Sequence, residues 1–147
     1  MTMFKLYRIP IAYLLLYVLA ILATGLWLFL LSQGLQSSES ILTLLKEIAQ
    51  KPETKSLHNF VEVAMPHMFA MGTMVFVLAH FMLFSTNIRE KHSLWVAMIL
   101  YGTMFLNIFA YLLIIFGVLT SGWIKLLSLA LFLLLFLLML GMVLFSL

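Results

Sequence analysis

Cysteine is absent from the 147 residues of the sequence, and charged residues make up only 9% of them. Without cysteine the chain has no thiolate to form a disulfide, a zinc–thiolate site or an iron–sulfur cluster. The scarcity of charge accompanies a hydrophobic content of 65%, whereas a typical soluble domain is about 45–50% apolar and about 25% charged. A soluble fold of this length cannot bury so much apolar surface. The composition therefore predicts an integral membrane protein.

Recognisable catalytic motifs are also absent. The sequence has no glycine-rich phosphate loop, no HExxH zinc motif and no complete set of nucleophile and base. Its net charge of +3 is scattered along the chain and forms no basic stripe of the kind that binds nucleic acid. We therefore expect a non-catalytic subunit or an electron carrier rather than an enzyme by itself, and no nucleic-acid partner.

Four long apolar segments dominate what the sequence does contain. Each is long enough, at about 1.5 Å of helix per residue, to cross a hydrocarbon core of about 30 Å. The links after the second and third segments are short, which favours antiparallel neighbours. We predict an all-α integral membrane protein, a single membrane domain over residues 1–147. Its four transmembrane helices would form an up-down-up-down bundle, at residues 10–31, 63–85, 93–119 and 124–146.

A polar stretch, residues 32–60, separates the first two segments and carries much of the charge. Within it, apolar residues recur on one face at helical spacing, namely Ile41, Leu44, Leu45 and Ile48. Ser38 or Ser40 would cap such a helix at its N-terminus. The pattern predicts a short amphipathic helix over residues 39–50, in the loop between spans one and two. It would lie on the membrane surface or over the end of the bundle.

The orientation in the membrane rests on positive charge. A cytoplasmic N-terminus places four Lys or Arg residues on each side, so a raw count decides nothing. Lys5 and Arg8 directly flank the first span, and the first span usually dominates orientation. We expect both termini in the cytoplasm, in a bacterial inner membrane. The lipid bilayer and other membrane subunits are the expected partners.

Two histidines lie at membrane depth, where ionisable side chains are costly and are candidates for function. His67 and His80 are both in the second span, and His58 and His92 lie near its ends. Imidazole is a ligand of haem iron. We predict haem b as the cofactor, with His67 and His80 as buried ligands and His58 and His92 as their second ligands. The chain would be an electron-transfer subunit of a larger respiratory-type complex, or coupled to one, and would exchange electrons with a partner or a quinone.

Two histidines on one spanning helix resemble the arrangement in dihaem b-type membrane cytochromes, in which the ligands place one haem near each membrane face. His67 and His80 are thirteen positions apart, which gives about 20 Å of rise and suits two haems. The same spacing leaves the two rings about 140° apart around the helix axis. In this the sequence departs from that arrangement, since each ring would face a different neighbour.

A row of methionines competes with the haem interpretation. Met71 and Met74 lie about 40° and about 20° from His67 around the same helix. Imidazole with soft thioethers is a ligand set for Cu(I). The alternative is therefore a Cu(I)-handling membrane protein with a metal site at His67, Met71 and Met74, although no other span shows a matching site. A structural accessory subunit without a cofactor is a further alternative, and we rank the three as haem, accessory subunit and copper.

Overall fold

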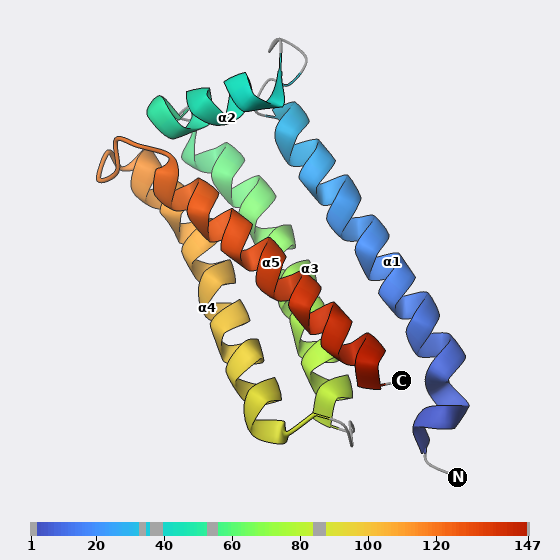
Figure 1. Cartoon of the computed structure of the whole chain (residues 1–147). Coiled ribbons are helices and arrows are strands. Elements are labelled where there is room, and N and C mark those ends of the chain that lie inside the picture. The colour runs from blue at the N-terminus through green and yellow to red at the C-terminus, as the bar shows by residue number, and fades with distance from the viewer. Residues whose placement is uncertain (1–2, 33–34, 36–39, 53–55, 84–87, 147) are drawn as a thin grey trace.

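Four long helices form the body of the protein. The computed structural model describes residues 3–32, 35, 40–52, 56–83 and 88–146, with side chains from residue 8 onward. Each long helix is apolar enough to cross a membrane, and successive helices alternate in direction (Figure 1). The predicted up-down-up-down bundle is therefore confirmed, and its helices are α1 (Met3–Ser32), α3 (Leu57–Leu83), α4 (Glu90–Ile115) and α5 (Trp123–Ser146).

The predicted amphipathic helix is also present, as α2 (Ile41–Gln50). The side-chain oxygen of Ser40 caps it by accepting a hydrogen bond from the backbone N–H of Thr43, at 3.2 Å. On its apolar face Leu44 and Ile48 are buried, whereas Ile41, at the first turn, is 49% exposed. The helix lies across one end of the bundle (Figure 1).

Several helix boundaries differ from the predicted spans. Helix α1 begins at Met3, so Pro10 lies inside it and does not open it. Helix α3 begins at Leu57, so Pro66 lies inside the helix. Proline has no backbone N–H, so the carbonyl of Glu62 receives no helical hydrogen bond from residue 66. Helix α4 ends at Ile115 because Gly117 adopts a φ of 71°. Glycine readily adopts this left-handed conformation, which commonly ends a helix.

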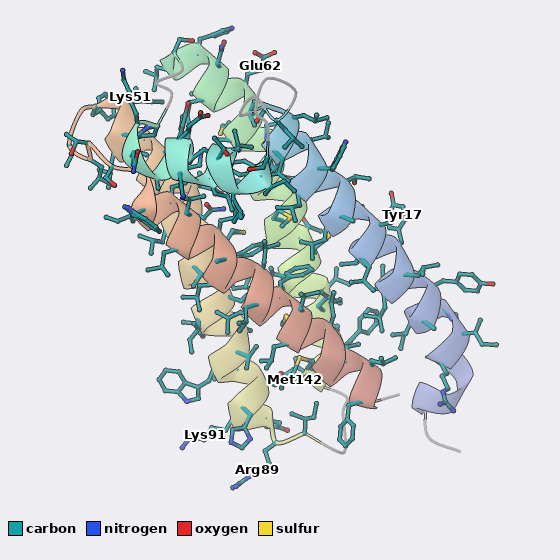
Figure 2. All side chains as sticks on the ribbon, turned by 45° about the horizontal axis from the view of Figure 1, so that its top comes forward. Tyr17, Lys51, Glu62, Arg89, Lys91 and Met142 are labelled. Carbon is teal, nitrogen blue, oxygen red and sulfur yellow. The ribbon has the colours of Figure 1, made fainter. Side chains whose placement is uncertain are left out.

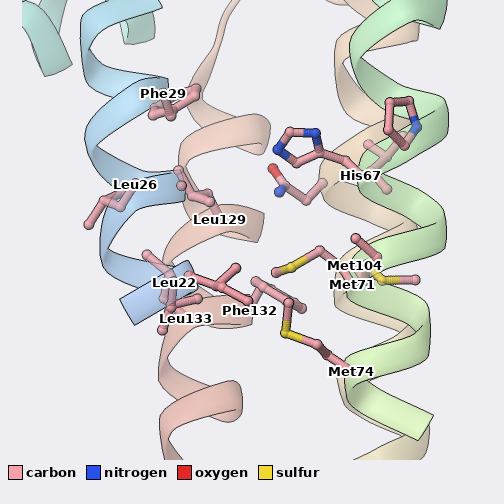
Figure 3. Close-up of a pocket in the computed structure, with 16 residues that line it drawn as sticks. Leu22, Leu26, Phe29, His67, Met71, Met74, Met104, Leu129, Phe132 and Leu133 are labelled. Atoms are coloured by element: carbon pink, nitrogen blue, oxygen red, sulfur yellow. The ribbon is translucent and has the colours of Figure 1, made fainter. Parts of the chain in front are cut away.

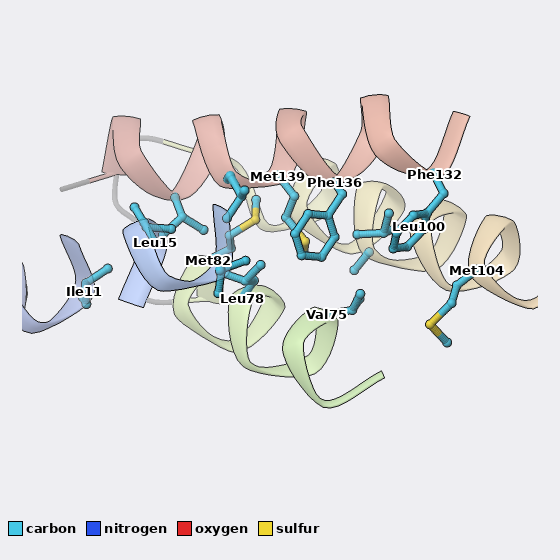
Figure 4. Close-up of a cluster of buried hydrophobic side chains, with 14 residues drawn as sticks. Ile11, Leu15, Val75, Leu78, Met82, Leu100, Met104, Phe132, Phe136 and Met139 are labelled. Carbon is cyan, nitrogen blue, oxygen red and sulfur yellow. The ribbon is translucent and has the colours of Figure 1, made fainter. Parts of the chain in front are cut away.

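The buried core lies among α3, α4 and α5, and α1 contributes one side of it. Val75, Leu78, Leu100 and Phe136 are fully buried at its centre (Figure 4). Helix α1 packs mainly against α5. It is therefore the most peripheral of the four spanning helices.

Charged side chains gather at the two ends of the bundle. Lys51 and Glu62 lie near one end, and Arg89 and Lys91 lie near the other (Figure 2). The band between them is apolar, as expected for helices that cross the hydrocarbon core of a bilayer.

Candidate functional site

All four spanning helices line one cavity of about 410 Å³. This volume lies in the range of small-molecule and cofactor sites, about 300–1,000 Å³. Most of its wall is aliphatic or aromatic. The atoms with coordinating or hydrogen-bonding ability come from His67, Met71 and Met74 of α3 and from Met104 and Asn107 of α4 (Figure 3). We call this space the methionine cavity.

The imidazole of His67 is held in one tautomer. Its Nδ1 lies 3.0 Å from the backbone oxygen of Val63, one turn earlier in α3. A carbonyl oxygen only accepts hydrogen bonds, so Nδ1 is the donor, and in the neutral ring Nε2 carries the lone pair. An Nδ1–H bond to a backbone carbonyl is a common way to orient a metal-ligating histidine. His67 is exposed rather than buried as the sequence suggested, and its ring lines the methionine cavity.

Three thioethers line the same cavity. Met71 and Met74 share the His67 side of α3, as their spacing in the sequence predicts, and both are partly buried against the core. Met104 comes from α4 and is 6% exposed. It reaches across to α3 where Gly72 has no side chain, because its Cε lies 4.0 Å from the position that a Cβ on Gly72 would take. One imidazole and three thioethers from two helices thus line one space.

The other candidate histidines lie elsewhere. His80 is on an exposed side of α3 and stacks on Phe76, with ring centroids 6.2 Å apart. His58 and His92 are exposed in the first turns of α3 and α4. Among the described residues that line the methionine cavity, His67 supplies the one imidazole. The structure therefore does not bring a second histidine to His67 inside this cavity.

Carboxylates take no part in the candidate site. Within the described part of the chain, no three side chains of His, Asp or Glu form a group that could hold a metal ion. Glu62, near the start of α3, is exposed. The possible donors that line the methionine cavity are soft sulfur atoms and a borderline nitrogen, a set suited to soft transition metals rather than to Mg²⁺ or Ca²⁺.

A family model, Aq_1264_TM, described as a transmembrane helical domain, matches residues 35–147. The chain belongs to this family. The matched region contains α2 to α5, with all three methionines and the histidine of the methionine cavity, while α1 precedes it. No curated protein matches the chain, and no solved structure matches it. Family membership and the four apolar helices together make this an integral membrane protein in contact with the lipid bilayer.

Proposed function

We propose that this protein handles copper in the membrane and binds Cu(I) in the methionine cavity. The supporting observation is that Met104 of α4 lines the same space as His67, Met71 and Met74 of α3. Thioethers are soft ligands that select Cu(I), and imidazole also suits copper. A thioether and a neutral imidazole carry no charge, so Cu(I) held by them would add a single positive charge to the site.

The position of Met104 changes the ranking of the three functions that the sequence suggested. The weakness of the copper interpretation was the lack of a candidate ligand from a second span, and the thioether of Met104 in α4 is such a candidate. A haem held by two imidazoles needs a second histidine at His67, and the methionine cavity has none among its lining residues. The electron-transfer role with haem b stays a prediction, as does the role of accessory subunit without a cofactor.

Copper titration of the purified protein tests the proposal. The protein in detergent is titrated anaerobically with Cu(I) in the presence of a chromophoric Cu(I) chelator, and the affinity is read from the competition. We expect one Cu(I) per chain. His67→Ala and Met104→Leu should each weaken binding by at least about tenfold, the lower bound for losing a group that supports a metal site.

Met98→Leu is the matched control for Met104→Leu. Met98 lies on the same helix and is 62% exposed, so its thioether faces away from the cavity. The control should bind Cu(I) like the wild type. Equal affinity of wild type and Met104→Leu would contradict the proposal. A Soret band in the isolated protein that disappears in His67→Ala would instead support the haem prediction.

A further inference from the structure

A second cavity, of about 230 Å³, lies beside the methionine cavity at the end of the bundle. Three of its polar residues lie where helices begin or end. Ser32 is the last residue of α1, and Asn59 and Lys125 are the third residues of α3 and α5. These positions place the polar rim at the level where the helices leave the hydrocarbon, so we call this space the interfacial cavity.

The ammonium of Lys125 is positioned by aromatic rings of two other helices. Its Nζ lies 3.9 Å from the ring centroid of Tyr111 and 5.3 Å from that of Phe29. Phe60 stacks on Tyr111, with centroids 5.9 Å apart. These contacts attract the cation to the ring faces and restrict a flexible side chain before any ligand arrives.

Deeper in the interfacial cavity, His67 and Asn107 are shared with the methionine cavity, and the rest of the wall is apolar. Val63 and Leu129 line it and lie four residues further into α3 and α5 than Asn59 and Lys125. This spacing puts them about 6 Å deeper in the membrane. A cationic rim above an apolar wall matches a molecule with an anionic head and a hydrocarbon tail. Basic pockets between transmembrane helices bind the head groups of anionic lipids in this way.

We infer that the interfacial cavity binds one anionic phospholipid. Its phosphate would pair with Nζ of Lys125 beside the amide of Asn59, and its acyl chain would begin along Val63 and Leu129. This lipid site needs neither thioethers nor copper. A failure of the copper proposal would therefore leave this inference intact, and the reverse also holds.

Native mass spectrometry of the copper-free protein tests the lipid site. The protein is titrated in detergent with phosphatidylglycerol or with zwitterionic phosphatidylcholine. We expect the wild type to retain one phosphatidylglycerol at a lower lipid concentration than phosphatidylcholine. Lys125→Gln should weaken phosphatidylglycerol binding by about fivefold, the effect of one basic residue near an anionic head group. Lys125→Arg keeps the charge and should keep the preference.

Lys46→Gln is the control, because Lys46 is exposed on α2 and lines neither cavity. It should bind phosphatidylglycerol like the wild type. Circular dichroism of Lys125→Gln should show an intact helical bundle. Equal binding of the two lipids by the wild type would overturn the inference. So would an unchanged preference in Lys125→Gln, or competition by soluble glycerol phosphate at the same concentration as the lipid.

Discussion

At the scale of single residues, one hydrogen bond joins α3 to α4 beside the methionine cavity. The phenol of Tyr101 donates to the backbone oxygen of Gly72 at 3.1 Å. Gly72 also leaves room for Met104, and it directly follows Met71. The bond therefore holds the two helices that supply the sulfur atoms in a fixed relation.

Tyr101→Phe removes that hydrogen bond and keeps the ring. We expect the free energy of unfolding to fall by about 0.6 kcal/mol, the average for interhelical hydrogen bonds in a membrane protein. The measurement is reversible unfolding in mixed micelles of mild detergent and dodecyl sulfate. Tyr13→Phe is the control, because Tyr13 is 70% exposed on α1. An equal effect of both variants would show that the interhelical bond contributes nothing.

The sequence predicted the part of the candidate site that lies on one helix. The spacing of His67, Met71 and Met74 settles their shared face, because helix geometry relates residues of a single element. Met104 was missed, since its place depends on how α4 packs against α3, and no local pattern encodes that. The contacts of Thr103 show the same limit, because its hydroxyl donates to the backbone oxygen of Leu100 in its own helix, at 2.9 Å.

At the scale of elements, backbone contacts with the turn before α5 hold α2 over the end of the bundle. The backbone oxygen of Ala49 accepts the N–H of Gly122 at 3.0 Å and the hydroxyl of Ser121 at 2.9 Å. These bonds satisfy a carbonyl in the last turn of α2 that has no partner within the helix. A Cβ on Gly122 would overlap the backbone oxygen of Ile48. Close backbone contact thus attaches α2 to the turn before α5.

Gly122→Ala should therefore loosen α2 without affecting the spans. Overpacking costs about 1–3 kcal/mol, so the open state of α2 should become at least about fivefold more populated. The chain has no cysteine, so Leu44→Cys, at a buried position of α2, can report opening through its rate of thiol labelling. Gly141→Ala is the control, since a Cβ there meets nothing within 4 Å. Equal labelling rates in the two backgrounds would contradict the docking role of Gly122.

Hydropathy predicted the number and order of the elements better than their ends. A run of apolar residues marks the part of a helix inside the hydrocarbon, whereas the helix itself continues into the interface. Helix α3 accordingly begins at Leu57, six residues before the predicted span. Predicting the end of α4 required recognising Gly117 as the left-handed residue that stops the helix.

At the scale of the whole molecule, α1 begins and α5 ends at the same end of the bundle (Figure 1). Arg89 and Lys91, at the start of α4, lie at this end too (Figure 2). Lys46 and Lys51, in and just after α2, lie at the opposite end, as does Lys125 in the first turn of α5. The two ends are thus nearly balanced in positive charge, and orientation rests on the residues that flank the first span.

This balance makes orientation sensitive to Lys5 and Arg8. A green fluorescent protein fused after Leu147 fluoresces only in the cytoplasm, and alkaline phosphatase fused after Lys51 is active only outside it. We expect the wild type to give fluorescence at the C-terminus and phosphatase activity in the loop, because positive flanks of the first span stay inside. The double variant Lys5→Gln/Arg8→Gln should shift part of the population to the inverted orientation and reduce both signals. Lys46→Gln/Lys51→Gln removes two charges from the opposite end and should reduce neither. Phosphatase activity at Leu147 in the wild type would place the termini outside and reverse the orientation.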